Sequence, residues 1–199
     1  SGGLCTLDQA LARPVALIES GPAGGAMLAA ELARGHGLER VLSFDMGGTT
    51  AKLCLVDGGA AHTSRAFEVA RVYRFLPGSG LPLRIPVINM VEIGAGGGSI
   101  ARVDRLGRVA VGPDSAGAQP GPACYGRGGT APTVTDADLV LGRLDPADFA
   151  GGSLRLDADA ATFALDGVAA ALGTTTAVAA YAVAELVDEN MANAARVHG

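Results

Sequence analysis

Residues 41–56 read Val-Leu-Ser-Phe-Asp-Met-Gly-Gly-Thr-Thr-Ala-Lys-Leu-Cys-Leu-Val, and the rest of the chain is organised around them. Two short apolar runs, residues 41–44 and 51–56, predict strands. Residues 45–50 between them form a turn that carries an acid, two glycines and two hydroxyls. The sequence therefore predicts a strand–turn–strand unit whose turn holds the polar chemistry of this region.

The polar residues of this unit suit a phosphate bound together with a magnesium ion. A carboxylate at the end of a buried strand needs a cation or donors, and glycines let backbone amides approach an anion closely. Hydroxyls and a lysine add donors and positive charge. The candidate ligands are Asp45, Gly47, Gly48, Thr49, Thr50 and Lys52, with Asp45 as the acid for hydrated Mg²⁺. The alternative is a hairpin whose glycines only satisfy a turn with positive φ.

The composition favours close-packed helices and glycine-built loops. The 199 residues suffice to bury a sizeable core in one generous domain or two small ones. Apolar residues make up 49% of the chain and glycine contributes 30 residues, but aromatic residues are only 4% and Trp is absent. The net charge of −5 argues against a nucleic-acid partner, because such a surface needs a basic patch.

The cysteine and apolar patterns predict a cytoplasmic protein. Cys5, Cys54 and Cys124 are far apart and indicate neither a disulfide framework nor a zinc site. No apolar stretch reaches about 18 residues, so neither a transmembrane helix nor a membrane partner is predicted, and no signal peptide is recognised. The chain begins with Ser1 and ends inside a helical pattern, so we expect it to be part of a longer protein.

Before the central stretch, the sequence predicts a strand at residues 15–19 and a helix over residues 26–34. Ser20 is the expected N-cap, and Gly35 and Gly37 are the expected stop. The glycine-rich start of this helix, Ser20-Gly-Pro-Ala-Gly-Gly25, offers free amides to an anion. Ordinary capping, with small residues for tight packing, is the alternative.

After the central stretch, the pattern is rich in strands up to a dense glycine loop. A hairpin turn at Asp57-Gly-Gly59 precedes predicted strands at residues 60–69 and 71–75, a loop at 76–82, a β-rich run at 84–93 and a strand pair at 101–103 and 109–111. The loop Gly94-Ala-Gly-Gly-Gly-Ser-Ile100 is entropically expensive, so it should serve a close backbone approach. A ligand cradle and a packing bend both explain it.

The last third of the chain combines a long irregular segment with helices. Residues 112–132 predict an ordered loop, in which Cys124 is either a nucleophile or a small packed thiol. A helix is expected to begin within residues 133–136, capped by Thr135 or Asp136, and to run through Leu141. Asp136 and Asp138 either complement its dipole or contact a metal or substrate. Ala-rich helices are predicted at residues 158–172 and 176–197. In the second, one stripe for packing is formed by Ala180, Val183, Ala184, Val187 and Met191.

Taken in order, these segments resemble the hydantoinase/oxoprolinase family, which includes N-methylhydantoinase, 5-oxoprolinase and acetone carboxylase subunits. The matching segments are Ser20-Gly-Pro-Ala-Gly-Gly25, Phe44-Asp-Met-Gly-Gly-Thr-Thr50 with Lys52, Gly94-Ala-Gly-Gly-Gly-Ser-Ile-Ala101, Gly112-Pro-Asp-Ser-Ala-Gly-Ala118, Pro120-Gly-Pro-Ala-Cys-Tyr-Gly126, Pro132-Thr-Val-Thr-Asp-Ala-Asp-Leu139, Leu141-Gly-Arg-Leu144 and Asn190-Met191. Each segment alone is a weak signal, whereas the ordered series is specific.

The resemblance implies an α/β fold: an RNase H-like ATPase half-core of the actin/Hsp70/sugar-kinase type, with an extra β region and C-terminal helices. Residues 1–150 would be the ATPase-like region, and residues 151–199 a helical region leading to an adenosine-binding segment. Residues 45–50 correspond to the second of two phosphate turns. The first turn and the adenosine segment have no match in this chain, so we expect it to bind Mg·ATP weakly and to be inactive alone.

The resemblance also implies a bacterial, ATP-dependent hydrolase that phosphorylates a cyclic amide or imide for ring opening. Asp45 would be the catalytic residue in the Mg²⁺ shell, and Gly47, Gly48, Thr49 and Thr50 would contact the phosphates. Lys52 would assist electrostatically or cover the strand edge. A second phosphate or substrate contact would come from Gly96, Gly97, Gly98 and Ser99. The implied partners are the rest of the large subunit and a smaller, hydantoinase B-like subunit. The alternatives are an acetone-carboxylase-type subunit acting on a ketone, and a non-catalytic docking domain.

Overall fold

The protein is a mixed α/β chain made of two compact units. The structure, a computed structural model, describes residues 4–65, 67–69 and 78–198. The first unit comprises the described residues of 1–45 and 52–91, and the second comprises residues 46–51 and 92–198. The predicted α/β class is confirmed. The predicted division into an ATPase-like region of residues 1–150 and a helical region of residues 151–199 stays a prediction.

The first unit opens with two short helical turns instead of the predicted strand at residues 15–19. Helix α1 (Leu7–Ala12) starts with a capping box in which Thr6 and Gln9 exchange hydrogen bonds. A 3₁₀ turn, η1 (Pro14–Leu17), follows, and its first residue is a proline. The strand prediction was wrong because the fixed φ of Pro14 favours a helical turn, which outweighs a short apolar run.

Helix α2 (Ser20–His36) packs through a face made of alanine. Ala23, Ala26, Ala30 and Ala33 are its buried residues. They lie against Cys54, Val56 and Ile88 in two small clusters. Ser20 is the first helical residue rather than the predicted cap, because Glu19 occupies the cap position with φ of 61°. Gly37, with φ of 64°, ends the helix as predicted.

The predicted strand–turn–strand is present. Strands β1 (Arg40–Met46) and β2 (Ala51–Asp57) are followed by β3 (Ala60–Ala61) in the order β1-β2-β3, and β8 (Val91–Ile93) also pairs with β2. The Asp57-Gly-Gly hairpin is confirmed, since Val56 faces Ala61 and Asp57 faces Ala60.

The strand predicted for residues 60–69 is divided into short pieces. These pieces are β3, β4 (Thr63–Ser64) and β5 (Phe67–Val69); β4 pairs with β7 (Val87–Ile88), and β5 pairs with β6 (Leu81–Leu83). The predicted strand at 71–75 lies outside the described residues.

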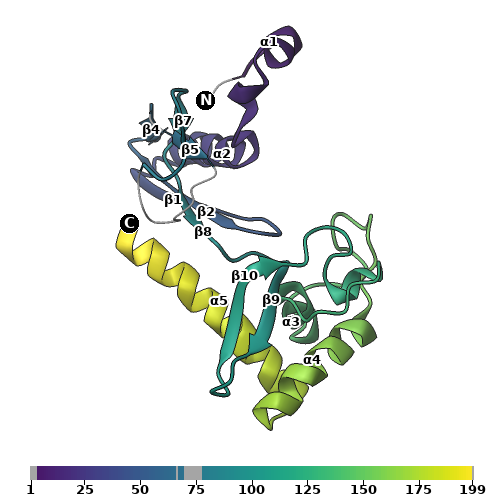
Figure 1. Cartoon of the computed structure of the whole chain (residues 1–199). Coiled ribbons are helices and arrows are strands. Elements are labelled where there is room, and N and C mark those ends of the chain that lie inside the picture. The colour runs from purple at the N-terminus through teal and green to yellow at the C-terminus, as the bar shows by residue number, and fades with distance from the viewer. Residues whose placement is uncertain (1–3, 66, 70–77, 199) are drawn as a thin grey trace. The chain divides into compact units, whose positions relative to one another are not determined.

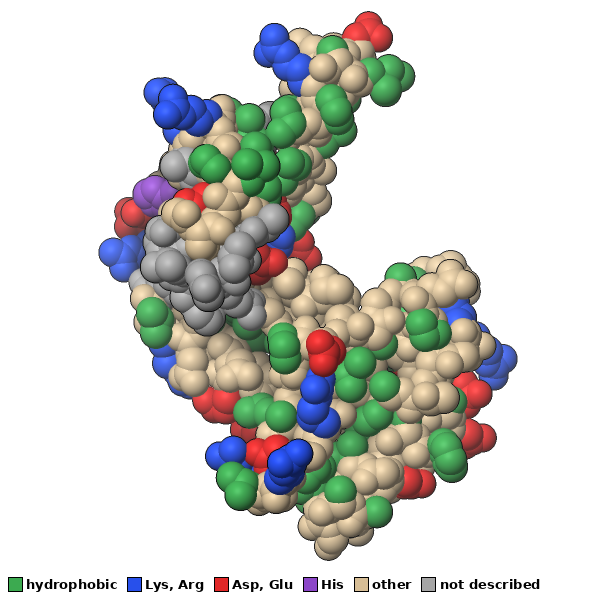
Figure 2. Space-filling model, viewed as in Figure 1, with side chains coloured by type: hydrophobic (Ala, Val, Ile, Leu, Met, Phe, Trp, Pro, Cys, Tyr) green, Lys and Arg blue, Asp and Glu red, His purple; other side chains and the backbone are tan. Residues whose placement is uncertain are grey.

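Large apolar side chains remain exposed in the first unit. Figure 2 shows them over α1 and η1, where Leu7 is 74% and Leu11 is 72% exposed. On α2, Leu28 and Leu32 are also exposed, as is Phe44 on β1. The small alanine-lined core of this unit therefore leaves apolar surface that the described residues of the unit do not cover.

The second unit is a β-hairpin packed against helices. Strands β9 (Ser99–Val103) and β10 (Val109–Ser115) pair antiparallel, which confirms the predicted hairpin. They are followed by a 3₁₀ turn, η2 (Ala123–Tyr125), and by α3 (Val134–Val140), α4 (Ala158–Leu172) and α5 (Thr176–His198). Helix α5 runs along the hairpin and packs against α3 and α4 (Figure 1).

Two hydrophobic clusters hold these elements together, one along α3, α4 and α5 and one around Cys124 of η2. The predicted α5 stripe of Ala180, Val183, Ala184, Val187 and Met191 is buried, and most of it packs with Leu165 and Val168 of α4. Among the described residues, no single helix meets the length and hydropathy criteria for a membrane span, and α4 with α5 meets them only as a pair bent by 90°.

Candidate functional site: the Gly47–Thr50 turn and the scaffold behind it

The turn after β1 is tight and exposed. The Gly47 amide donates to the Thr50 carbonyl oxygen at 2.9 Å. Residues 47–49 are exposed, and a side chain added at Gly48 would meet nothing within 4 Å. Within the described residues of the second unit, the amides of Gly48 and Thr49 have no hydrogen-bond acceptor. The turn therefore presents unpaired donors to an open space, as an anion site requires.

Asp45 is the next-to-last residue of β1, in the first unit. Its side chain is exposed rather than at the end of a buried strand, because β1 is covered only in part. Within the described part of its own unit, the carboxylate has no ion-pair or hydrogen-bond partner. No group of three or more metal-ligating side chains exists among the described residues. A single free carboxylate fits a magnesium ion that keeps most of its waters, since Mg²⁺ is held in this way beside phosphates.

The glycine-rich loop after β8 holds the turn from behind. The Gly97 amide donates to the Gly47 carbonyl oxygen at 3.0 Å, and the Gly98 amide donates to that of Gly48 at 2.7 Å. The Ser115 hydroxyl also lies 3.4 Å from the Gly48 carbonyl oxygen. The carbonyls of Gly47 and Gly48 are therefore both held by the loop. The Gly48 and Thr49 amides of the same turn are left unpaired by the described residues of this unit.

The crowding at this loop explains its glycines. A Cβ at Gly96 would lie 2.5 Å from the Gly47 carbonyl oxygen and 2.8 Å from the carbonyl carbons of Gly48 and Thr49. A Cβ at Gly98 would lie 2.9 Å from the Gly48 carbonyl oxygen. The close backbone approach expected from the sequence is confirmed, and what approaches is the backbone of the turn itself.

Ser99 is buried in this scaffold. Its hydroxyl accepts a hydrogen bond from the Gly96 amide at 2.9 Å, and its side chain is fully covered. Because the amides of Gly97 and Gly98 already donate to the turn, these residues act within the protein. Their contact with phosphate or substrate stays a prediction.

Helix α3 anchors the glycine-rich loop. The Thr135 amide and its hydroxyl each donate to the Gly97 carbonyl oxygen at 2.8 Å. The N-cap is Thr133, which forms a capping box with Asp136. The prediction that Thr135 or Asp136 caps the helix was wrong by two or three residues, because the sequence Thr-Val-Thr-Asp offers several competing caps.

Asp136 connects α3 to the loop of residues 120–126. Its carboxylate is fully buried and accepts from the amides of Cys124 at 2.8 Å, Thr133 at 2.9 Å and Ala123 at 3.3 Å, and from the Thr133 hydroxyl at 2.7 Å. A buried carboxylate is tolerable when donors surround it in this way. Of the two roles left open by the sequence, these contacts favour a structural one.

Cys124 and Asp138 are also accounted for by packing. The Cys124 side chain is fully buried, and burial, together with the Asp136 carboxylate, raises its pKa well above that of an ordinary thiol. A thiol held protonated is a poor nucleophile. Burial raises the pKa of Asp138, and the Arg143 guanidinium, 3.2 Å from its carboxylate, opposes that rise. Arg143 also contacts Asp188 of α5 at 3.2 Å.

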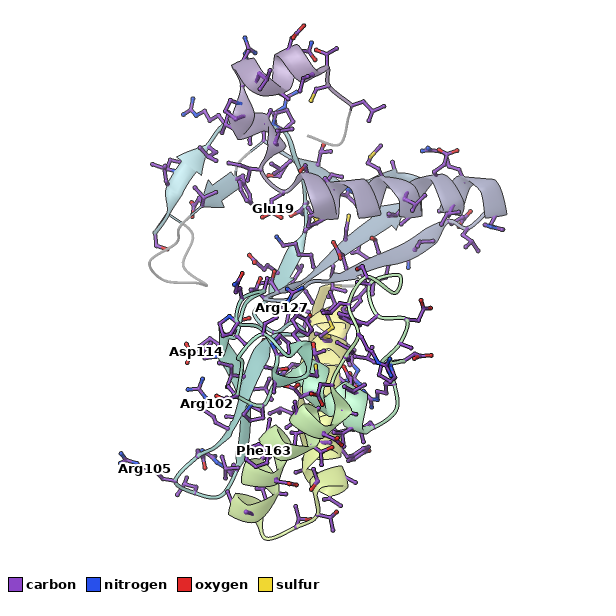
Figure 3. All side chains as sticks on the ribbon, turned by 90° about the vertical axis from the view of Figure 1, so that its right-hand side faces the viewer. Glu19, Arg102, Arg105, Asp114, Arg127 and Phe163 are labelled. Atoms are coloured by element: carbon purple, nitrogen blue, oxygen red, sulfur yellow. The ribbon has the colours of Figure 1, made fainter. Side chains whose placement is uncertain are left out.

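Lys52, in the first unit, is paired with a residue that the sequence did not single out. The Lys52 ammonium donates to the Glu19 carboxylate, and both side chains are largely covered. Figure 3 shows Glu19 where α2 begins, with a left-handed φ that is uncommon for a residue other than glycine. No spacing rule predicts this pair, because it joins residues 33 positions apart.

An exposed ion pair joins the two strands of the β9–β10 hairpin. The Arg102 guanidinium lies 2.6 Å from the Asp114 carboxylate, on neighbouring strands (Figure 3). Pairs this exposed contribute little to stability. The polar contacts that organise the second unit are therefore the buried ones behind the turn.

Comparison with known proteins agrees with this arrangement of motifs. The hydantoinase/oxoprolinase family model matches residues 1–198. The caprolactamase subunit alpha of Pseudomonas jessenii is 40% identical over 197 residues, which cover 98% of this chain and 27% of that relative.

Two solved structures are also similar. The nucleotide-free structure of acetone carboxylase, from work on ATP-dependent acetone carboxylation, matches 89% of this chain and 24% of its own, with a TM-score of 0.75 and 31% identity. The crystal structure of the ATP-dependent caprolactamase from Pseudomonas jessenii matches 86% of this chain and 24% of its own, with a TM-score of 0.70 and 40% identity.

The chain spans about a quarter of the length of these relatives. The family match covers nearly all of it, and four of the matching segments, at Gly47, Gly97, Ser115 and Thr135, are joined by hydrogen bonds within the second unit. The chain belongs to the hydantoinase/oxoprolinase family.

Proposed function

We propose that this chain is the central part of an ATP-dependent enzyme that activates a cyclic amide or imide for hydrolysis. The observation that carries the proposal is the outward-facing Gly47–Thr50 turn, whose carbonyls are held by the amides of Gly97 and Gly98. A backbone fixed in this way presents donors without reorganising when charge develops on a phosphate. The similarity to ATP-dependent caprolactamase and acetone carboxylase supports ATP as the phosphate donor.

The residues of the turn divide into two roles. Gly48 and Thr49 would donate their free amides to the β- and γ-phosphates, while the hydroxyls of Thr49 and Thr50 add further donors. Asp45 would hold a water-coordinated Mg²⁺. The RNase H-like ATPase half-core is part of this proposal, with the turn as the second of two phosphate turns and the remaining contacts supplied by the rest of the subunit.

ATP would supply a phosphoryl group to the amide oxygen, which would make the ring carbon electrophilic enough for water to add. The ring C–N bond would then break, and hydrolysis of the resulting acyl phosphate would release phosphate. The chain's own task is to orient that phosphoryl group and to neutralise its charge during transfer. A second candidate, ATP-dependent carboxylation of a ketone, is favoured by the similarity to acetone carboxylase. The same turn serves both reactions, because both begin with phosphoryl transfer to an oxygen.

Lys52 has a role within the first unit. Its charge is already compensated by Glu19, and the pair joins β2 to the start of α2. Electrostatic assistance by Lys52 stays a prediction.

Further predictions concern the whole protein. The name of the caprolactamase alpha subunit supports a partner subunit, and the hydantoinase B type of that partner stays a prediction. A non-catalytic docking role for this chain, a bacterial origin and a cytoplasmic location also stay predictions.

Substitution of Asp45 in the full-length subunit tests the proposal. Asp45→Asn removes the charge that holds the metal's water shell, and we expect substrate-dependent ATP hydrolysis to fall by about a hundredfold or more. Asp57→Asn, at the exposed end of β2, is the matched control and should retain activity. Hydantoins, 5-oxoproline, lactams and ketones are the substrates to screen, and circular dichroism checks the fold. Unchanged turnover in Asp45→Asn would remove Asp45 from the metal shell.

A further inference from the structure

We infer that Thr135 is a positioning residue that holds the phosphate turn through Gly97. This inference rests on the proposed function, because it assigns Thr135 to the support of the same site. Thr135 lies 38 positions from Gly97 in sequence and 85 or more positions from the turn. Its hydroxyl donates to Gly97 and therefore acts on the turn through that residue.

Thr135 holds one peptide group with two donors. Its amide and its hydroxyl both lie 2.8 Å from the Gly97 carbonyl oxygen. The amide alone would satisfy the carbonyl, so the second bond fixes orientation rather than merely pairing a polar group. Thr135 is 6% exposed, so water does not compete for these bonds.

Gly97 passes this constraint to the turn. Gly97 accepts from Thr135 at its carbonyl oxygen, and its own amide donates to the Gly47 carbonyl oxygen at 3.0 Å. On the other side, the Ala116 amide donates to the Gly98 carbonyl oxygen at 2.8 Å, and Gly98 donates to Gly48. The two carbonyls of the turn are therefore each tied to a different part of the scaffold, one to α3 and one to the residue that follows β10.

The anchor itself is rigid. Thr135 lies between Thr133 and Asp136, which form the capping box, and Asp136 is bonded to the amides of Cys124 and Ala123. A group that positions a reacting centre needs such locked support, because a small displacement lowers the rate strongly. The Thr135 hydroxyl is a side-chain group, so it can be removed from this series of hydrogen bonds without changing the backbone.

The test compares three variants of the full-length subunit. Thr135→Val preserves the shape of the side chain but removes its hydroxyl, and Thr135→Ser retains the hydroxyl. Thr162→Val is the matched control, because it deletes a threonine hydroxyl that donates to the Ala158 carbonyl oxygen at 2.8 Å on the exposed surface of α4. We expect Thr135→Val to lower kcat for ATP hydrolysis about tenfold with KM for ATP little changed, since the lost orientation matters most in the transition state. Thr135→Ser and Thr162→Val should resemble the wild type.

Amide hydrogen exchange gives a readout that does not depend on activity. In Thr135→Val, the amide of Gly97 should exchange faster than in the wild type and in Thr162→Val, whereas the amide of Gly98, whose carbonyl is held by Ala116, should change less. Unchanged exchange at Gly97, or equal loss of kcat in Thr135→Ser, would overturn the inference. Faster exchange with unchanged ATP hydrolysis would support the hold of Thr135 on the turn and would instead contradict the phosphate assignment.

Discussion

Two glycine-rich segments look alike in the sequence but differ in what their glycines do. Within residues 20–25, a Cβ added at Gly21, Gly24 or Gly25 would meet nothing within 4 Å. Within residues 94–99, a Cβ at Gly96 would lie 2.5 Å from another backbone atom, and Cβ atoms at Gly97 and Gly98 would lie 2.8 Å and 2.9 Å from their neighbours. Glycine is optional in the first segment and required in the second.

The difference shows that glycine density alone does not identify a ligand loop. The first segment lies inside helix α2, where small residues allow close packing on the sheet but leave room on the outer face. In the second, the crowding atoms belong chiefly to the turn of residues 47–50. The glycines of this segment are therefore explained by a close contact between two backbone segments of the chain, which supports a site.

The largest expected difference is between Gly96→Ala and Gly24→Ala. The new methyl at residue 96 collides with backbone atoms that cannot move aside as a side chain can, so we expect it to destabilise the second unit by about 2–3 kcal/mol. At residue 24 the methyl is free in an exposed part of α2, and the helix should gain up to about 1 kcal/mol. Chemical denaturation followed by circular dichroism measures both.

The sign of the stability change in Gly96→Ala and in Gly24→Ala tests the contrast between the two glycine-rich segments. A neutral Gly96→Ala would mean that the turn and the loop are not in contact in solution. A destabilising Gly24→Ala would mean that something outside the described residues covers that face of α2.

A smaller effect is expected at Gly98, because one of its two obstacles is a side chain. A Cβ there would lie 2.9 Å from the Gly48 carbonyl oxygen and 2.9 Å from the Ser115 hydroxyl oxygen. Gly98→Ala combined with Ser115→Ala should therefore be less destabilised than the two single effects added together, by about 1 kcal/mol. Gly98→Ala combined with Ser153→Ala is the control and should be additive, since the Ser153 hydroxyl donates to the Ala150 carbonyl oxygen at a distant turn of the second unit. Additivity in both pairs would contradict the crowding at Ser115.

Much of the fold followed from local patterns in the sequence. The hairpins, the Ala-rich helices and the buried stripe of α5 were predicted correctly, because their periodicity and turn residues are strong local signals. The predictions failed where two local rules competed: Pro14 outweighed an apolar run, and Thr133 outweighed Thr135 as a helix cap. The predicted strand over residues 60–69 failed for a different reason, since its pieces pair with different partners.

The candidate site was predicted in part. The motif Asp45 to Thr50 marked the turn, and the glycine loop was expected to serve a close approach. No local signal showed that the approach is to the turn, that Thr135 holds Gly97, or that Glu19 pairs with Lys52. These contacts join residues more than 30 positions apart, and side-chain types alone do not specify such pairings.

The smallest expected effect compares two buried thiols, one in each unit. Cys54 packs against Ala23 and Ala26 of α2, whereas Cys124 is tied through its amide to Asp136. Burial raises the pKa of the Cys54 thiol; burial together with Asp136 raises that of Cys124. Both thiols therefore stay protonated at neutral pH and react only when their region opens, and both rates should rise with pH as thiolate forms in the opened state.

We expect Cys54 to be alkylated faster than Cys124 in a Cys5→Ser background, which removes the exposed thiol. The first unit opens at lower cost, because its buried core is mostly alanine while its larger apolar side chains are exposed. Alkylation followed over time at neutral pH, with the labelled peptides separated by mass spectrometry, measures both rates. Faster labelling of Cys124 would contradict the comparison. Adding Gly96→Ala should accelerate Cys124 and leave Cys54 unchanged, because the methyl strains only the scaffold that Asp136 and Thr135 connect to the turn.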